Sequence, residues 1–296
     1  MLVTIFTPTY NRAYIINELY KSLLRQTNSD FEWIVVDDGS SDNTEDLINS
    51  FISAGKLDIK YFKVKNGGKH RAINHGVLNA NGELFFIVDS DDYLYDNAIE
   101  RILYHYNFIA NDNLFGGICG LKTYFTGHLV GGEFNYNIID CNSLEFRFKY
   151  HIKGDVAEVF KTKILKEYPF PELDNEKFCP EALIWNRIAL NYKLRYFNEK
   201  IYLCDYLPDG LTAKIIQLRM KSPEASNIYY SELYNMKIPL IQKIKAAINY
   251  WRFAFCSRQQ FKNKVSQIGL LSLPLLPLGY LFHINDRRNE DSSRYK

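Results

Sequence analysis

Three carboxylates stand within four positions of one another, directly after an apolar run. The stretch 85–94 reads FFIVDSDDYL, and its acids are Asp89, Asp91 and Asp92. Like charges this close repel one another, and each costs free energy to remove from water. Grouped carboxylate oxygens are hard ligands that suit Mg²⁺ or Mn²⁺, which commonly share their coordination with phosphate oxygens. The stretch therefore predicts a site for a divalent cation and a diphosphate, whose presence would make the repulsion tolerable.

A helix N-terminus is the alternative explanation for these acids. An N-cap carboxylate and a favourable position in the helix dipole account for one acid, or for two. They do not account for all three, so the cation site is favoured.

Polar residues also follow two earlier apolar runs. Thr7-Pro8-Thr9 ends the first run, and Asp37-Asp38-Gly39 ends the second. Asp-Gly-Ser after a strand is often only turn chemistry, and for Asp37 and Asp38 taken alone this alternative has equal weight.

The elements that must position these residues alternate between strand and helix. Continuous apolar runs predict strands, and apolar residues at helical spacing predict helices between them. The predicted strands are residues 2–7, 31–36, 59–64 and 83–88, and the predicted helices are 13–26, 41–53 and 69–80. This alternation predicts an α/β fold with a doubly wound, mostly parallel sheet flanked by helices. Ligands bind such sheets outside the carboxyl ends of the strands, so the polar groups are expected along one edge.

Four motifs in this order resemble those of the family 2 glycosyltransferases of the GT-A fold. They are TPTYNR (7–12), VVDDGSSDNT (35–44), NGGKHRAINHGVLNANGE (66–83) and VDSDDYL (88–94). Each motif alone is weak, but four in register are specific. The resemblance implies transfer of a sugar from a nucleotide-sugar, usually UDP-linked, to an acceptor hydroxyl, with inversion at the anomeric carbon.

The resemblance also implies roles for individual residues. Thr7, Pro8, Thr9 and Tyr10 would line the nucleoside, and Arg12 is a further candidate there.

Other motif residues would contact the rest of the donor. Asp38, or its neighbour Asp37, would hydrogen-bond the base imide, and Lys69 and Arg71 would contact the nucleotide. The family's usual Ala-Arg-Asn is replaced here by HRAIN at 70–74.

Asp89-Ser90-Asp91 resembles the D-x-D element of the family. Asp89 would face the ribose, with Ser90 among the nucleotide contacts. Asp91 would hold the metal, Mn²⁺ or Mg²⁺, and Asp92 and Asp89 are further candidate ligands.

Glu181 is the candidate general base. The stretch CPEALIWNRIA (179–189) places it four residues before Trp185, at the start of a predicted helix, where the family has its catalytic base. An acceptor hydroxyl is a poor nucleophile until a carboxylate takes its proton. The alternative is a first-turn carboxylate that only interacts with the helix dipole.

Asp155 is the second catalytic candidate. Its stretch, GDVAEVF, resembles a segment of some family members in which a Gly-Asp pair precedes a short strand, and it would contact the acceptor or the donor sugar. The alternative is a simple Gly-Asp turn. Glu158 is interpreted as structural, and so are His128 and His151, although either histidine could supply a late metal ligand.

The C-terminal region has an unusual charge pattern. Seven cations and no acids lie between Glu232 and Asp286, interleaved with Tyr250, Trp251 and Phe253. The stretch 268–284 has no charged residue, but it is short for a membrane span and contains two prolines. The basic and aromatic residues together predict contact with anionic lipid headgroups. We interpret 268–284 as an interfacial or re-entrant segment, and the alternative is a C-terminal helical pair packed on the catalytic domain.

These features give a predicted domain plan. Residues 1–210 are the catalytic domain, with a nucleotide-binding half (1–100) and an acceptor half (101–210). Residues 211–285 are a helical, membrane-associating extension, and 286–296 a polar tail that is expected to be disordered.

Composition narrows the choice of partners and compartment. The net charge of +2 is too balanced to favour nucleic acid. Five scattered cysteines and an N-terminus without a basic, cleavable leader predict a cytoplasmic protein. Together with the C-terminal region, they predict a location at the cytoplasmic face of the inner membrane.

The sequence thus predicts a metal-dependent inverting glycosyltransferase of cell-surface polysaccharide synthesis, whose partners are a nucleotide-sugar and a glycan or lipid-linked glycan. One alternative is a nucleotidyltransferase, but TPTYNR supplies no glycine-rich phosphate loop. Another is a non-catalytic nucleotide-binding protein of the same fold, which predicts damage to the acidic motif, and that motif is intact.

Overall fold

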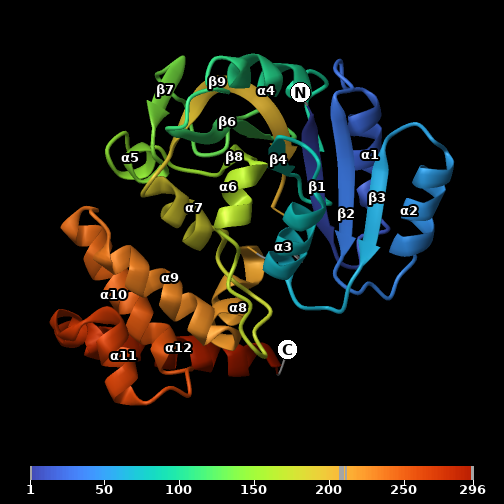
Figure 1. Cartoon of the computed structure of the whole chain (residues 1–296). Helices are drawn as coiled ribbons and strands as arrows, with labels where there is room; N and C mark the ends of the chain where they lie inside the picture. The colour runs from blue at the N-terminus through green and yellow to red at the C-terminus, as the bar shows by residue number, and fades with distance from the viewer. Residues whose placement is uncertain (1, 207–209, 211, 295–296) are drawn as a thin grey trace. The chain divides into compact units, whose positions relative to one another are not determined.

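The computed structural model describes residues 2–206, 210 and 212–294 (Figure 1). They form two compact units, Met1–Phe170 with Arg187–Asp205, and Pro171–Asn186 with Tyr206–Lys296. This division differs from the predicted domain boundary, because residues 171–186 belong to the second unit. Helix α7 (Glu181–Ala189) begins in the second unit and ends in the first.

The first unit is built on a mixed sheet. Its strands are β1 (Val3–Thr9), β2 (Phe31–Asp37), β3 (Ile59–Lys63), β4 (Leu84–Ile87), β5 (Tyr93–Leu94), β6 (Phe115–Tyr124), β7 (Ile138–Cys141), β8 (Val156–Lys161) and β9 (Lys193–Cys204). Its helices are α1 (Ile16–Leu24), α2 (Thr44–Ser53), α3 (Lys69–Asn79), α4 (Ala98–Asn107), α5 (Ser143–Phe148) and α6 (Thr162–Glu167). The strands and helices predicted up to residue 88 are all present, with ends shifted by a few residues.

The sheet has the order β3-β2-β1-β4-β8-β6-β9-β5, and β7 pairs with β9. Strands β3, β2, β1 and β4 are parallel, and Figure 1 shows them side by side. Strand β8 runs antiparallel to both β4 and β6. The α/β sheet flanked by helices is therefore confirmed, and its second half is more mixed than the alternation of early elements suggested.

The two faces of the sheet are covered by different helices. Ile16, Ile48 and Ile102, from α1, α2 and α4, share one buried cluster with Trp33 of β2 and other strand residues. Helix α3 contacts β1 and β2, and α6 contacts α3. Helix α3 approaches closely through Gly76, where an added Cβ would lie 2.3 Å from the ring of Phe6. Strands β1, β2 and β4 thus have both faces largely buried, as their apolar runs require, whereas the edge strand β3 is only partly buried.

The second unit is helical. It contains η1 (Thr212–Lys214), α8 (Ile215–Lys221), α9 (Pro223–Asn235), α10 (Leu240–Ala254), α11 (Phe261–Ile268), η2 (Leu270–Leu275) and α12 (Leu276–Arg294). Tyr250, Trp251 and Phe253 are buried in it, and the first two join a cluster with Ala247 and Ala254. The prediction that these aromatic residues face lipid is wrong, because they form the unit's own core.

The prediction of a disordered tail is also wrong as far as Arg294, because α12 continues to that residue. Asp286, where the tail was expected to begin, is buried and receives two hydrogen bonds from Arg252, at 2.5 and 2.7 Å. Residues 295–296 lie outside the described residues.

No single helix within the described residues is long and apolar enough to cross a membrane. The segments Phe261–Ile268 and Leu270–Asn289 meet the length and composition criteria only as a pair, which is bent by 106°. Several apolar side chains of this pair are exposed: Leu270 is 71%, Leu271 87% and Leu281 62% exposed.

Candidate functional site

The acidic motif lies at the carboxyl end of β4, as predicted. The backbone N–H of Val88 donates to Phe6, which keeps the chain beside β1 up to the start of the motif. The ammonium of Lys69, the first residue of α3, lies 2.6 Å from one oxygen of Asp89 and 2.9 Å from the other. Two residues that the sequence places twenty positions apart therefore form an ion pair at this edge.

Two further cations lie at this edge. Arg12, in the loop after β1, places a guanidinium nitrogen 3.8 Å from an oxygen of Asp91. Lys122 of β6 lies with its ammonium 4.1 Å from the centre of the Tyr202 ring. The charges of Asp92 and Asp89 raise the pKa of Lys122 although burial opposes them, so its ammonium stays charged.

The three carboxylates differ in their pKa values. Burial raises the pKa of Asp89, but Lys69 and Lys122 lower it more, so its net shift is downward. Burial and the charge of Asp89 raise the pKa of Asp91, and the same two causes raise the pKa of Asp92 to about 7. Repulsion inside the motif is therefore real, and a cation placed there would relieve it.

Tyr202 of β9 connects two of the acids. Its hydroxyl donates to Asp92 at 2.6 Å and accepts the backbone N–H of Asp89 at 3.1 Å. This buried contact joins β9 to the motif and orients Asp92.

The helix N-cap alternative for these acids does not hold. Asp92 is followed by β5, whose Tyr93 and Leu94 pair with β9. The next helix, α4, begins at Ala98 with Asn97 at its N-cap.

Asp37 and Asp38 have different environments at the end of β2. Asp37 is fully buried, accepts the N–H of Ser40 at 2.7 Å, and accepts the hydroxyl of Tyr61 at 2.7 Å. The turn interpretation therefore fits Asp37. Asp38 accepts the backbone N–H groups of Gly67 and Gly68 at 2.6 and 2.8 Å, and it thereby fixes the loop that leads to Lys69.

The remaining motif residues lie around the same edge. Thr7 is fully buried and accepts the indole N–H of Trp33 at 2.9 Å, so its side chain belongs to the sheet interior. Thr9 is 3% exposed, and its hydroxyl has no hydrogen-bond partner within the described residues. Tyr10 is 50% exposed.

Three other predicted contacts are less exposed than Tyr10. Ser90 is buried between Asp89 and Asp91. Pro8 lies within β1, and Arg71 lies in the first turn of α3 beside Gly67. Their roles toward a nucleotide stay predictions.

Asp155 is exposed and directly precedes β8, after Gly154 with φ +79°. Both the turn interpretation and a ligand contact fit this position. Burial raises the pKa of Glu158, on the same strand, to about 7.

Glu181 belongs to the second unit. It is the first residue of α7, and Trp185 follows one turn later. The predicted helix start is confirmed. The role of Glu181 as a base stays a prediction, because a first-turn carboxylate also suits the helix dipole.

No group of three or more His, Cys, Asp or Glu side chains within the described residues is arranged to hold a metal ion. A Mg²⁺ or Mn²⁺ ion that also binds phosphate oxygens needs only one or two carboxylates. Asp91, 19% exposed and paired with Arg12 only at 3.8 Å, together with Asp89 fits such a shared site.

The sequence interpretation missed Lys122 and Tyr202. Tyr202 is 110 positions from Asp92, and it arrives at the edge only because β9 pairs with β5. A lysine or tyrosine within a strand gives no sequence signal of such a long-range contact.

Comparisons with known proteins agree with this architecture. Residues 4–127 match the model of the family described as Glycosyl transferase family 2. An uncharacterized glycosyltransferase of Rickettsia bellii is 30% identical over 236 residues, which are 80% of this chain and 29% of that protein. Glycosyltransferase GlyG of Streptococcus pneumoniae is 26% identical over 222 residues, which are 68% of this chain and 70% of GlyG. The chain thus spans less than a third of the Rickettsia bellii relative.

Solved structures share the fold. Staphylococcus aureus TarS 1–349 in complex with UDP-GlcNAc aligns with a TM-score of 0.68 at 20% identity, covering 100% of this chain and 92% of TarS 1–349. The mannosyltransferase PcManGT of Pyrobaculum calidifontis, in complex with GDP-Man and Mn²⁺, aligns with a TM-score of 0.55 at 16% identity, covering 96% and 87%. The predicted GT-A fold with a C-terminal helical extension is confirmed. Residues 4–127 of this chain are thus a domain of the family 2 glycosyltransferases.

Proposed function

We propose that this chain is an inverting glycosyltransferase that moves a hexose or N-acetylhexosamine from a UDP-sugar to an acceptor hydroxyl in cell-surface polysaccharide synthesis. The observation that carries the proposal is the acidic edge at Asp89–Asp92, which meets Lys69 and Arg12. TarS is solved in complex with UDP-GlcNAc and PcManGT in complex with GDP-Man and Mn²⁺, and both complexes support a nucleotide-sugar as the donor.

The chain's own residues supply most of the chemistry. Lys69 and Arg12 would exchange their carboxylate partners for the oxygens of the donor diphosphate, which holds the leaving group in place. A divalent ion on Asp91 and Asp89, when bound, would add positive charge as the diphosphate leaves.

Glu181 would take the proton of the acceptor hydroxyl. The acceptor oxygen then forms a bond to the anomeric carbon while the bond from that carbon to the diphosphate oxygen breaks. A single displacement of this kind inverts the anomeric centre and needs no covalent enzyme intermediate.

The test is a panel of UDP-, GDP- and dTDP-sugars, with binding and hydrolysis measured with and without Mn²⁺. We expect one donor class to bind in a metal-dependent manner, with Asp91→Asn losing that binding. Glu181→Gln should keep donor binding and lose turnover. Its matched control is Glu45→Gln, because Glu45 is also a first-turn helix carboxylate and lies on α2. If no donor binds with metal, or if Asp91→Asn and Glu181→Gln both retain turnover, the proposal fails.

We also propose that the second unit contacts anionic lipid at the cytoplasmic face of the membrane, where a glycan or lipid-linked glycan acceptor would be met. Leu270, Leu271 and Leu281 are exposed, and the chain has seven cations and no acids between Glu232 and Asp286. Exposed apolar side chains beside cations suit the interface of an anionic bilayer.

A further inference from the structure

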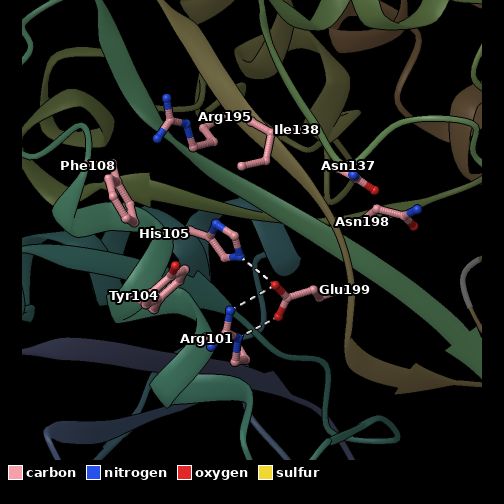
Figure 2. Close-up of a pocket in the computed structure, with 9 residues that line it drawn as sticks. All are labelled: Arg101, Tyr104, His105, Phe108, Asn137, Ile138, Arg195, Asn198 and Glu199. Carbon is pink, nitrogen blue, oxygen red and sulfur yellow. Dashed lines mark hydrogen bonds and ion pairs between the residues drawn. The ribbon is translucent and has the colours of Figure 1, made fainter.

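A pocket lies between α4 and the strands β7 and β9 (Figure 2). Its volume is about 420 Å³, within the range of small-molecule sites. It shares no lining residue with the acidic motif or with that motif's cationic partners. Its lining residues are Arg101, Tyr104, His105, Phe108, Asn137, Ile138, Arg195, Asn198 and Glu199.

The charges of this pocket are already paired. Arg101 donates to Glu199 from Nε at 2.5 Å and from Nη2 at 2.9 Å. Arg195 donates to Asp140 in the same two-pronged way, at 2.9 and 2.7 Å. A phosphate would have to displace both carboxylates without the divalent ion that is proposed for the acidic edge, so a neutral ligand is favoured over a nucleotide.

The pocket nevertheless keeps many hydrogen-bonding groups. A guanidinium has five N–H donors, and each arginine uses two of them on its carboxylate partner. The side chains of Asn137 and Asn198 are exposed at the rim, and each amide carries donors and an acceptor; one N–H of Asn198 already donates to the carbonyl of Phe134 at 3.4 Å. A hydrogen bond from Asn198 N–H to the carbonyl of Asn137, at 2.9 Å, fixes these two residues relative to each other.

His105 adds an unsatisfied acceptor. It is 4% exposed, and its Nε2 lies 2.8 Å from Glu199. The ionised carboxylate can only accept, so Nε2 carries the proton, and burial lowers the pKa of the ring, which keeps it neutral. The other nitrogen, Nδ1, is then an acceptor without a partner within the described residues, but it is itself buried, so the groups open to a ligand are those of the arginines and asparagines.

Two aromatic rings complete the pocket. Tyr104 lies on α4 and Phe108 is the residue that caps this helix at its C-terminus. The two side chains are 48% and 64% exposed, and their ring centres are 5.3 Å apart. Arg101 lies over the Tyr104 ring at 4.3 Å and holds it in place. Exposed rings beside planar polar groups offer an apolar face and directed hydrogen bonds to the same ligand.

We propose that this pocket binds one or two pyranose units of a neutral glycan, as a holding site separate from the acidic edge. A pyranose presents C–H faces that suit the rings of Tyr104 and Phe108, and hydroxyl groups that both donate and accept. The choice of a glycan over another neutral polyol rests on the proposed function. The pocket would retain the acceptor or product chain between transfers.

The test is saturation-transfer NMR on the full chain with N,N′-diacetylchitobiose, cellobiose and lactose as probes. We expect at least one disaccharide to bind with a Kd of about 1–10 mM, which is typical of a site with few contacts. Phe108→Ala and Asn198→Ala should each reduce the signal at least about fivefold, which corresponds to about 1 kcal/mol. Both residues are exposed, so the fold should survive. Phe261→Ala is the control, because Phe261 is 59% exposed in the second unit.

Donor binding to the same samples separates this proposal from the proposed function. If a disaccharide signal depends on Phe108 while no nucleotide-sugar binds, the pocket stands and the proposed function falls. If no disaccharide binds, or if the signal survives Phe108→Ala, the pocket proposal is overturned. Light scattering is run in parallel, and a change of oligomeric state in Phe108→Ala without sugar binding would instead identify a protein interface.

Discussion

Asp38 allows a sharp test of how the edge is assembled. Its carboxylate accepts the N–H groups of Gly67 and Gly68, and this fixes the loop that places Lys69 beside Asp89. In Asp38→Asn one oxygen becomes an NH₂ group, which would face an N–H donor. One charge-assisted hydrogen bond is lost and a buried donor is left without a partner. The expected loss of unfolding free energy is about 2–4 kcal/mol.

Two measurements on Asp38→Asn are decisive. For a unit of this size the thermal midpoint should fall by about 4–16 °C, since each kcal/mol shifts it by about 2–4 °C. Donor affinity, measured by calorimetry, should fall at least about tenfold, because Lys69 is displaced. Asp58→Asn, an exposed acid of the same unit, is the control for a lost surface charge.

Gly68→Ala perturbs the same loop without touching the carboxylate. Gly68 has φ +98°, where a side chain is strained, so we expect weaker donor binding in this variant as well. If Asp38→Asn abolished donor binding with an unchanged thermal midpoint, Asp38 would act on the base alone, and the reasoning about the loop would be refuted.

Three other predictions concern the sheet, the edge and the second unit. Glu32 is fully buried and accepts from Thr4 and Lys60 at 2.6 Å, so Glu32→Gln should cost about 2–3 kcal/mol in urea unfolding. Burial raises the pKa of Glu32, but these hydrogen bonds lower it more. The contribution of the ionised carboxylate to the free energy of unfolding is therefore present above pH 4.5 and is lost as the pH falls. A difference between wild type and variant that grew toward low pH would contradict this. Tyr202→Phe removes a hydrogen bond that lowers the pKa of Asp92, so the pH midpoint of metal-dependent donor binding should rise. The control Tyr150→Phe should leave this midpoint unchanged. An unchanged midpoint in Tyr202→Phe would show that Asp92 is not involved. Leu271→Asp with Leu281→Asp should abolish cosedimentation with phosphatidylglycerol vesicles, whereas Leu78→Asp, an equally exposed leucine of the first unit, should not; equal losses would argue against a lipid-binding surface.

The first half of the fold was predictable because its signals are local. Strands β1, β2 and β4 are largely apolar runs, and polar residues end or follow them, as Asp37 and Asp89 do. Sequence order then places them on one edge without any knowledge of long-range pairing. The position of β8 between β4 and β6 has no such signal, because antiparallel insertion depends on contacts between distant segments.

The second half shows why composition can mislead. Cations and aromatic residues alternate along α10, which suggested a lipid-facing helix. Six positions of α10 are buried, and four of them, Ala247, Tyr250, Trp251 and Ala254, are spaced as one helix face and share one cluster. That spacing was visible in the sequence, and it indicates a core-facing stripe more directly than the composition indicates a membrane.

Within the site, the sequence identified the acids but not what balances them. Lys69 was expected to contact the nucleotide, and in the structure it pairs with Asp89. Lys122 and Tyr202 had no expected role. Short motifs identify the residues at the end of a strand. Two partners of those residues, Lys122 and Tyr202, come from strands that are distant in the sequence.

The balance of three acids by three cations has a thermodynamic consequence. With Arg12, Lys69 and Lys122 beside Asp89, Asp91 and Asp92, the edge has almost no net charge of its own. A lone divalent ion would meet three cations there, and a lone diphosphate would meet three carboxylates. Bound together, the ion and the diphosphate form a nearly neutral pair, in which the ion contacts the carboxylates and the diphosphate contacts the cations. Each should therefore increase the affinity of the other by the same factor, and the coupled affinity should vary little with ionic strength.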